Sequence, residues 1–308
     1  MKKIFITGGA GFIGSHLVSS LLKDGKYVTV YDSLAAGRRE FLEENKKLLF
    51  IQADVLDNEK LNKEMKGHDF VFHLSANADI PKGNDRSEID LKQTFLSTIN
   101  VLEAMRKNKI KNMAFSSSSA VLGDPRVFPA DENYGYCEPI SLYGAAKLSS
   151  EAYISAYVNL FKINAWVFRF ANIVGSRSTH GVIYDFIRKL RTNPKKLEIL
   201  GDGNQTKSYL HVEDCVNAML YVINHTREAF NLYNISGHDT INVKRIAEIV
   251  TEEMKLKPKF LYTGTKGGWK GDVVRVQLGN NKIQSLGWKP IYNSEEAVRQ
   301  AVRSLLEN

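Results

Sequence analysis

The sequence predicts an α/β protein, with a doubly wound parallel sheet and a smaller C-terminal lobe. Short apolar runs alternate with longer amphipathic segments from the first residues onward, which is the pattern of a parallel sheet covered by helices on both faces. After residue 172 the alternation gives way to loops rich in Gly, Asn and Lys, which indicates a second lobe. The chain has 308 residues, of which 43% are hydrophobic, so it can bury a substantial core.

Each expected element has a local reason. Strands are expected where the chain is apolar and rich in β-branched or aromatic residues, and helices where apolar residues recur every three or four positions. The strands are residues 4–7, 27–31, 48–52, 69–73, 113–116 and 165–170, and the clearest helices are residues 13–22, 88–107 and 142–160. Asp24-Gly25 ends the first helix and Lys66-Gly67 leads into the fourth strand, because glycine readily takes up turn conformations.

The later part of the chain is expected to interleave the two lobes. Residues 209–224 again predict a helix, and residues 232–235 predict a short strand. We therefore expect the first lobe to comprise residues 1–171, with the chain returning to it at about 208–236. The second lobe is then expected to comprise residues 172–207 and 237–308.

Composition and charge exclude several classes of protein. The net charge is +8, but the basic residues are spread along the chain, so nucleic-acid binding is not expected. No run approaches the length of a membrane-spanning helix. Cys137 and Cys215 lie far apart and outside any CxxC motif, which argues against a disulfide framework or a structural metal site. The apolar run at the N-terminus is too short for a signal peptide, and a cytoplasmic protein is expected.

A glycine-rich turn follows the first expected strand. Gly8, Gly11 and Gly14 are spaced as in turns that let the backbone approach a pyrophosphate, and the helix that starts there offers free N–H groups and the positive end of its dipole. Asp32 lies 18 residues after Gly14, at the end of the second expected strand, where a carboxylate can accept both ribose hydroxyls of an adenosine. This combination predicts a dinucleotide site.

The carboxylate also indicates which dinucleotide is bound. A negative charge at position 32 would repel the 2′-phosphate of NADP, so NAD is favoured. Arg38 and Arg39 follow shortly after, and they keep NADP open as the alternative.

A tyrosine and a lysine lie one helical turn apart. Tyr143 and Lys147 are four positions apart at the start of an expected helix, so their side chains share one face, and an ammonium beside a phenol lowers the pKa of the phenol. Tyr262 and Lys266 have the same spacing, but their glycine-rich loop fixes no geometry. The fifth expected strand ends in four serines, residues 116–119, at the sheet edge where open α/β folds bind ligands. Together these groups predict a proton relay.

The motifs as a set resemble the extended short-chain dehydrogenase/reductase family, and within it the nucleotide-sugar epimerases of the UDP-glucose (UDP-galactose) 4-epimerase type. The resemblance covers nearly the whole chain. It rests on TGGAGFIGSHL, ADV, FHLSA, FSSSSAVLGD, SLYGAAK, FRFANIVG and LHVED, in that order. It implies an NAD-binding Rossmann domain at residues 1–171 and a substrate-binding lobe at residues 172–207 and 237–308.

The resemblance also implies roles for individual residues. The family's catalytic serine, tyrosine and lysine correspond to Ser118, Tyr143 and Lys147. Its cofactor-binding positions correspond to Gly8, Gly11, Phe12, Ile13, Gly14, Asp32, Asp54, Val55, Leu74, Ser75 and Ala76, together with Tyr143 and Lys147. Its substrate-binding positions correspond to Ser118, Asn172, Lys207, Trp269, Lys270 and Asp272. No metal is implied.

The implied reaction inverts C4 of a UDP-sugar, with UDP-glucose and UDP-galactose as the leading pair. Tyr143 as phenolate would remove the hydroxyl proton while NAD takes the hydride, and return of the hydride to the other face of the transient 4-keto sugar would invert the carbon. Related dehydratases carry an Asp-Glu pair where this chain has Ser119-Ala120. Two alternatives stay open: a reductase or 3,5-type epimerase of nucleotide sugars, and a non-catalytic relative that binds RNA or protein.

The sequence departs from the family pattern at several positions. Thr94 replaces a usual asparagine, Leu122 replaces a usual tyrosine, and Lys207 and Trp269 stand where diphosphate-binding arginines are usual. Val276 stands where a bulky residue excludes N-acetylhexosamines in some members, so acetylated sugars stay open as substrates.

The remaining signals are assigned structural or assembly roles. His211 and Cys215 are four positions apart, but no second pair accompanies them, so they are interpreted as structural. His73, at a strand end, is interpreted as a satisfied core histidine. The expected helices 88–107 and 142–160 resemble those that pair in family dimers, which implies a homodimer.

Overall fold

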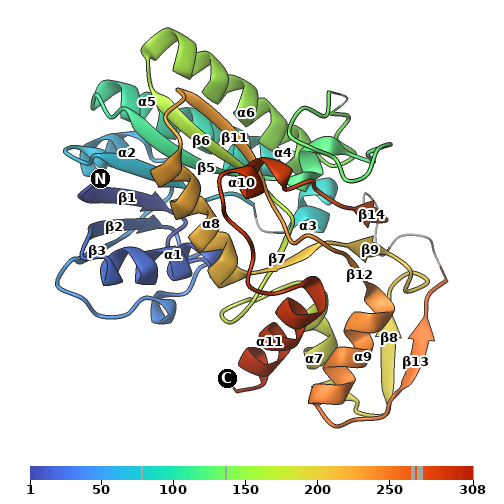
Figure 1. The fold of residues 1–308 in the computed structure, drawn as a ribbon. Coiled ribbons are helices and arrows are strands. Elements are labelled where there is room, and N and C mark those ends of the chain that lie inside the picture. Colours follow the sequence, from blue (N-terminus) through green and yellow to red (C-terminus); the bar gives the residue numbers. More distant parts are fainter. Residues whose placement is uncertain (78, 136, 265–267, 269–272, 308) are drawn as a thin grey trace. The chain divides into compact units, whose positions relative to one another are not determined.

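The computed structural model describes residues 1–77, 79–135, 137–264, 268 and 273–307 (Figure 1). The chain divides into two compact units. Unit 1 comprises Met1–Val121, Pro139–Arg169 and Ile223–Tyr233, and unit 2 comprises Leu122–Glu138, Phe170–Val222 and Asn234–Asn308. The chain therefore passes from one unit to the other more than once.

A seven-stranded sheet forms the centre of unit 1. Its strands are β1 (Lys3–Thr7), β2 (Tyr27–Asp32), β3 (Leu48–Gln52), β4 (Phe70–His73), β5 (Asn112–Ser118), β6 (Asn164–Phe170) and β11 (Phe230–Ile235). Their order is β11-β6-β5-β4-β1-β2-β3, and β1 pairs in parallel with both β2 and β4. All seven expected strands are present, and the doubly wound α/β fold is confirmed.

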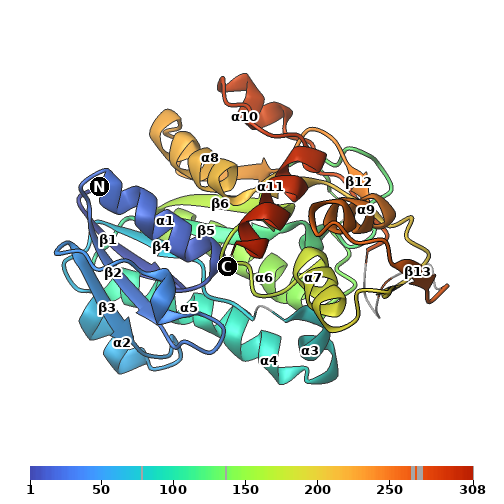
Figure 2. The ribbon, with the colours of Figure 1, turned by 90° about the horizontal axis from the view of Figure 1, so that it is seen from below.

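Helices cover both faces of this sheet. They are α1 (Phe12–Lys23), α2 (Asn58–Met65), α3 (Ile80–Asp85), α4 (Glu88–Asp90), α5 (Ser97–Lys107) and α6 (Leu142–Phe161). Short 3₁₀ turns are formed by η1 (Arg39–Phe41) and η3 (Ser119–Leu122). Figure 2 shows α1 on one face and α2 with α5 on the other. Coverage on both faces explains why strands such as β4 are mostly apolar and are buried at every position rather than at alternate ones.

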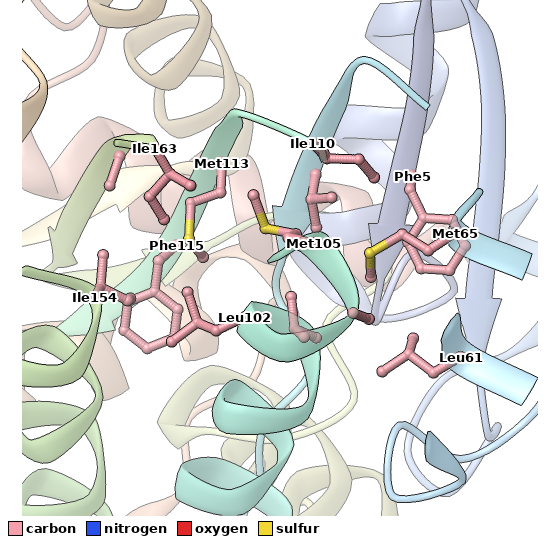
Figure 3. Close-up of a cluster of buried hydrophobic side chains, with 14 of the residues drawn as sticks. Phe5, Leu61, Met65, Leu102, Met105, Ile110, Met113, Phe115, Ile154 and Ile163 are labelled. Carbon is pink, nitrogen blue, oxygen red and sulfur yellow. The ribbon is translucent and has the colours of Figure 1, made fainter. Parts of the chain in front are cut away.

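The core of unit 1 lies between the sheet and the layer formed by α2, α5 and α6. In Figure 3, Met65 from α2 lies by Phe5 of β1, while Leu102 and Met105 from α5 reach toward Phe115 of β5. All five side chains are buried. This packing fixes the position of β5, whose last residues carry the serines singled out in the sequence.

The expected helix 88–107 is interrupted, which corrects the sequence prediction. Between α4 and α5, Leu91–Leu96 forms a π-helical stretch, η2, and the Ser97 N–H donates to the Lys92 carbonyl five residues back. The hydroxyls of Ser97 and Thr98 donate to the carbonyls of Gln93 and Thr94, four residues back, at 2.8 Å each. These side-chain bonds compete for the carbonyls that a regular helix would use, and they widen the turn.

Unit 2 is built from short elements around its own core. These are β7 (Asn172–Val174), α7 (Val182–Thr192), β8 (Lys196–Ile199), β9 (Thr206–Lys207), β10 (Tyr209–His211), α8 (Val212–His225), β12 (Ile241–Asn242), α9 (Val243–Glu253), β13 (Lys259–Tyr262), β14 (Arg275–Val276), α10 (Asn281–Ser285) and α11 (Ser294–Leu306). The strands form three small sheets, β10-β7, β12-β9-β14 and β13-β8. Helices α7, α9 and α11 bury their apolar faces together beside them.

The expected helix 209–224 begins later than predicted. Tyr209, Leu210 and His211 form strand β10, which pairs in parallel with β7, and the helix starts at Val212. All three side chains are buried, so pairing with β7 overrides the helical pattern. Within the described ranges, no helix is both long enough and apolar enough to span a membrane.

Candidate active site

The turn between β1 and α1 packs so closely against neighbouring backbone that it requires glycine. Gly8 has a left-handed backbone, with φ at +71°, and a Cβ there would lie 2.7 Å from the amide nitrogen of Ser75. The Gly11 N–H donates to the Gly8 carbonyl at 3.1 Å and closes the turn. A Cβ at Gly14 would overlap that same carbonyl oxygen. Only glycine fits at both positions without moving the backbone.

The start of α1 offers hydrogen-bond donors. Gly11 is its N-cap residue, in an extended conformation, and no side chain caps it, so the amides of Phe12 and Ile13 begin the helix without a side-chain acceptor. The helix dipole adds positive potential at the same point. This arrangement is the usual one for binding a pyrophosphate.

Asp32, at the end of β2, is buried and accepts hydrogen bonds from two backbone N–H groups, a structural role that the sequence does not indicate. Its Oδ2 accepts from the Ala10 N–H at 3.0 Å, and its Oδ1 accepts from the Leu34 N–H at 2.8 Å. Burial raises the pKa of this carboxyl, while the two backbone donors act in the opposite direction. Asp32 therefore ties the glycine turn to the end of β2, and its remaining lone pairs can still accept ribose hydroxyls.

The other expected cofactor positions lie at the same edge of the sheet. Residues 74–76 follow β4, where Leu74 N–H donates to the Thr7 carbonyl and Ser75 Oγ donates to Thr7 Oγ1. Val55 is buried after β3, and Asp54 Oδ1 accepts from the Leu56 N–H at 2.9 Å. Ala76 lies in the same loop as Ser75. The parallel strands β1 to β4 thus bring these segments together.

The arginines that kept NADP open are engaged within the protein. Arg38 lies 3.9 Å from the Glu40 carboxylate and over the Phe41 ring. Arg39 donates to the Leu42 carbonyl at 3.0 Å and lies over the Phe50 ring. The glycine turn, the open helix start and the Asp32 carboxylate suit NAD.

His73 is a satisfied core histidine, as its sequence position indicates. Its Nδ1 lies 2.7 Å from Thr7 Oγ1 and its Nε2 lies 3.0 Å from Thr98 Oγ1. Because the Thr98 hydroxyl donates to the Thr94 carbonyl, His73 Nε2 carries the proton and Nδ1 accepts from Thr7. Burial lowers the pKa of His73 to about 3, so the ring is neutral.

The serines at the end of β5 have different roles. Ser117 Oγ donates to Glu151 Oε1, which also accepts from the guanidinium of Arg169 in a buried ion pair. The Ser116 carbonyl accepts from Lys147 Nζ at 2.5 Å. Ser118 Oγ accepts from the Ala120 N–H at 3.2 Å and interacts with the Tyr143 hydroxyl. Ser118 is therefore the serine that lies beside the expected tyrosine.

Helix α6 positions the tyrosine and the lysine. Ser141 caps the helix by accepting from the Gly144 N–H at 3.1 Å, so Tyr143 and Lys147 lie on its first two turns. Lys147 is only 1% exposed, and its Nζ lies 5.7 Å from the centre of the Tyr143 ring and 4.6 Å from that of Phe115. The expected one-face arrangement is present.

The expected effect on the pKa of the phenol is corrected. Burial raises the pKa of Tyr143, the Asp90 carboxylate raises it further, and only the interaction with Ser118 lowers it. Burial also lowers the pKa of Lys147 to about 7, against the opposing influence of Glu151 and Asp90. The protein's own groups therefore hold Tyr143 as the neutral phenol, and the low pKa expected from Lys147 alone does not arise.

Asp90 is the functional candidate that the sequence analysis missed. It lies at the end of α4, is almost completely buried, and interacts electrostatically with both Tyr143 and Lys147. In the sequence it is one acidic residue at the start of an amphipathic segment. Only burial distinguishes it from its neighbour Glu88.

Of the expected substrate residues, Ser118 lies in unit 1, whereas Asn172 and Lys207 lie together in unit 2. Asn172 starts β7 and donates from Nδ2 to the Ser208 carbonyl at 3.2 Å, beside Lys207 of β9. In the register of the small sheet, Lys207 lies opposite the buried Val276. Trp269, Lys270 and Asp272 fall outside the described residues. The sheets of unit 2 thus bring Asn172 close to Lys207.

Comparison with known proteins agrees with this geometry. Residues 4–236 match the model of the NAD dependent epimerase/dehydratase family. A solved UDP-galactose 4-epimerase is 38% identical, with 99% of each chain covered and a TM-score of 0.90. The UDP-glucose 4-epimerase of Thermotoga maritima, solved with UDP-glucose, is 30% identical, with 99% of each chain covered and a TM-score of 0.91. The UDP-N-acetylglucosamine 4-epimerase of Methanobrevibacter ruminantium, solved with UDP-N-acetylmuramic acid, is 28% identical over 99% of this chain and 98% of that one, with a TM-score of 0.89.

These matches span the whole chain and not only the glycine turn. They confirm the extended short-chain dehydrogenase/reductase resemblance, the enzyme class and NAD as the cofactor. The chain belongs to the NAD dependent epimerase/dehydratase family.

Proposed function

We propose that the protein inverts C4 of a nucleotide-diphosphate sugar, with UDP-glucose and UDP-galactose as the substrate pair. One observation carries the proposal. Tyr143, Lys147 and Ser118 meet at the carboxyl end of β5, and the glycine turn follows β1 at the same edge of the same sheet. A proton-transferring hydroxyl and a dinucleotide cradle at one sheet edge suit the removal of a hydride and a proton from a sugar alcohol.

The chain's own groups divide this work. Bound NAD supplies the acceptor and the donor of the hydride. Tyr143 reacts as the phenolate: its Oη takes the proton of the C4 hydroxyl, which makes it the phenol, and later returns that proton to the 4-keto oxygen, while Ser118 Oγ hydrogen-bonds to the same oxygen of the sugar. Lys147 supplies a positive charge that favours the phenolate in the transition state. Burial raises the pKa of Tyr143 and so disfavours the phenolate. The Lys147 charge therefore matters most when water is excluded from the site, where electrostatic interactions are strongest.

The cofactor and substrate assignments come from the family resemblance, and the positions of the described side chains support them. We assign the pyrophosphate to the amides of Phe12 and Ile13 and the adenosine ribose to Asp32. Residues 54–55 and 74–76 are assigned to the adenine and nicotinamide sides of the cofactor. In unit 2, Asn172 and Lys207 are assigned to the sugar diphosphate, with Trp269, Lys270 and Asp272 as further contacts. Lysine supplies a point charge to a phosphate but lacks the fork of arginine, so weaker orientation of the diphosphate is expected.

The proposal is tested by supplying the purified protein with UDP-, GDP- and dTDP-hexoses and their N-acetylated forms, without added nicotinamide. We expect NMR spectra to show UDP-galactose and UDP-glucose interconverting, with no net oxidation or reduction. If only UDP-N-acetylhexosamines turned over, C4 epimerisation would be supported, but the substrate would be an acetylated sugar and not UDP-glucose or UDP-galactose. The small side chain of Val276 is compatible with that outcome. Consumption of added NAD(P)H by a keto sugar, or loss of water from the sugar, would contradict C4 epimerisation.

The assembly and location of the protein belong to the same proposal. We propose a cytoplasmic homodimer that pairs through residues 88–107 and 142–160. Large apolar side chains are exposed along these segments. They are Leu91, Leu96, Leu142, Tyr153, Leu160 and Phe161. Pairing with a second copy would remove them from water.

A further inference from the structure

Asp90 is a buried carboxylate that the proposed mechanism does not yet use. It is 1% exposed. Its Oδ1 accepts from Asn77 Nδ2 at 3.1 Å and from the Thr94 hydroxyl at 3.4 Å, whereas the buried Oδ2 has no hydrogen-bond partner among the described residues. Burying a carboxylate with an unsatisfied oxygen is costly, so its presence calls for a compensating interaction.

The fold makes room for this carboxylate at one specific point. A Cβ on Gly83 of α3 would overlap Asp90 Oδ2 and would lie 2.9 Å from Asn77 Nδ2. The Asn77 side chain also donates from Nδ2 to the Asp79 carbonyl at 2.9 Å, and the Asn77 backbone N–H donates to Thr94 Oγ1 at 3.2 Å. The carboxylate is therefore held in one place by α3, the loop before it and η2.

The same segment packs against the helix that carries the tyrosine and the lysine. Both α4 and η2 contact α6. Across this contact, the Asp90 carboxylate raises the pKa of Lys147, and the Lys147 ammonium works to lower the pKa of Asp90. Opposite charges that favour each other's ionised form are in mutual attraction. The attraction to Lys147 therefore adds to the hydrogen bonds from Asn77 and Thr94 in stabilising the buried carboxylate, although burial still raises its pKa.

Glu151 is the other carboxylate that favours the charged form of Lys147, and it does so more strongly than Asp90. Glu151, one turn along α6, is engaged in the buried ion pair with Arg169 and accepts from Ser117. From β4, His73 is neutral, and from β5 the lysine meets the Ser116 carbonyl and the Phe115 ring. Tyr143 is the remaining titratable neighbour on α6. Of the carboxylates described around Lys147, only Asp90 is not paired with a guanidinium.

We propose that Asp90 is a positioning residue that acts, beside the ion-paired Glu151, as a counter-charge of Lys147 and favours its ammonium form while Tyr143 exchanges its proton with the sugar. The inference rests on the proposed function, because it takes the Tyr143 and Lys147 roles from it. Burial has already lowered the pKa of Lys147 to about 7, so without Asp90 the lysine would lose its proton at a still lower pH, and the phenolate would then lose its positive neighbour. Asp90 extends to higher pH the range in which the lysine is charged.

The first test needs no sugar and no turnover. Protein labelled with ¹³C at lysine Cε is titrated by NMR, and the resonance that titrates near neutral pH is assigned to Lys147 with Lys147→Arg. In Asp90→Asn its midpoint is expected to fall by about one pH unit, because a nearby negative charge has been removed. Asp90→Ser, which is smaller and retains a hydroxyl, should give the same direction and covers the case in which the asparagine variant does not fold.

Glu88→Gln is the matched control. It removes one negative charge from the same short helix α4, but Glu88 is exposed and paired with Arg86. The Lys147 midpoint should stay in place in this variant. A midpoint that is unchanged in folded Asp90→Asn or Asp90→Ser overturns the proposal and leaves Asp90 as a structural tie for Asn77.

The second test separates this inference from the proposed function. In the NAD-loaded enzyme, the alkaline limb of the kcat profile reports loss of the Lys147 proton, and it should move to lower pH in Asp90→Asn, with kcat on that limb about tenfold lower. A change in KM or in thermal stability with an unmoved limb would contradict the proposal. If the unmodified enzyme does not epimerise sugars at all, the proposed function fails, while the lysine titration still decides the role of Asp90.

Discussion

Replacing Tyr143 by phenylalanine is expected to lower kcat for C4 inversion by about three orders of magnitude, within the range that a positioned acid–base group contributes. The substitution removes a single oxygen from a ring that lies 5.7 Å from Lys147 Nζ. The aromatic contact with the lysine persists, so bound NAD and the unfolding free energy should change little. Turnover in the NMR assay, measured under saturating UDP-galactose, gives the size of the effect.

Tyr262 provides a matched control for this variant. It has the same four-residue spacing to a lysine, but its side chain is 41% exposed on β13 in unit 2. Tyr262→Phe should therefore turn over UDP-galactose at the unmodified rate. Turnover by Tyr143→Phe within a few-fold of the unmodified enzyme would remove Tyr143 from its assigned role.

Replacing Gly14 by alanine is expected to weaken NAD binding by about 10- to 100-fold, since forcing a methyl group into a packed site costs about 1–3 kcal/mol. The new Cβ would overlap the Gly8 carbonyl oxygen and lie 2.8 Å from Gly9 Cα, so either the turn opens or α1 moves away from β1. Both movements displace the amides that we assign to the pyrophosphate. The NAD content of the purified protein and calorimetric titration with NAD measure the loss.

A glycine in an open loop shows whether this effect belongs to the turn. A Cβ at Gly135 would come no closer than 4.0 Å to the Asn133 carbonyl, and Gly135→Ala should bind NAD as the unmodified protein does. Normal NAD binding by Gly14→Ala would show that the close helix-to-strand contact at position 14 is not needed for the cofactor.

The sheet could be predicted from the sequence because its strands are buried on both faces. Strands such as β4 consist of short, mostly apolar runs that are buried at every position and bounded by turns, which is a pattern that the sequence displays. Two segments could not be predicted. The π-helical stretch depends on whether Ser97 and Thr98 bond back to the chain, and strand β10 depends on its pairing with β7.

Only those residues of the site that belong to sequence motifs could be predicted. The glycine turn, Asp32 and the Tyr143 and Lys147 pair all have fixed spacings that sequence displays. Which of four adjacent serines lies by the tyrosine depends on strand alternation, which turns Ser117 toward Glu151. Asp90 belongs to no motif, and its significance comes from burial and from the charge of Lys147.

The spacing of Tyr143 and Lys147 in the sequence predicts the wrong direction for the pKa of the phenol. An ammonium one helical turn away is expected to lower it, yet burial of both groups dominates and raises the pKa of Tyr143 while lowering that of Lys147 to about 7. Spacing gives the proximity of two groups but not the desolvation that each one suffers. The charge state of the site therefore also depends on the two carboxylates that act on Lys147, Glu151 and Asp90.

The central claim is that C4 is inverted by removing a hydride and returning it within one site. The most direct measurement supplies the purified enzyme, without added NAD, with UDP-galactose carrying deuterium at C4. If the hydride is removed and returned within one site, we expect UDP-glucose that still carries the deuterium at C4. UDP-glucose with solvent hydrogen at C4, or conversion only when fresh NAD is supplied for each turnover, would contradict it.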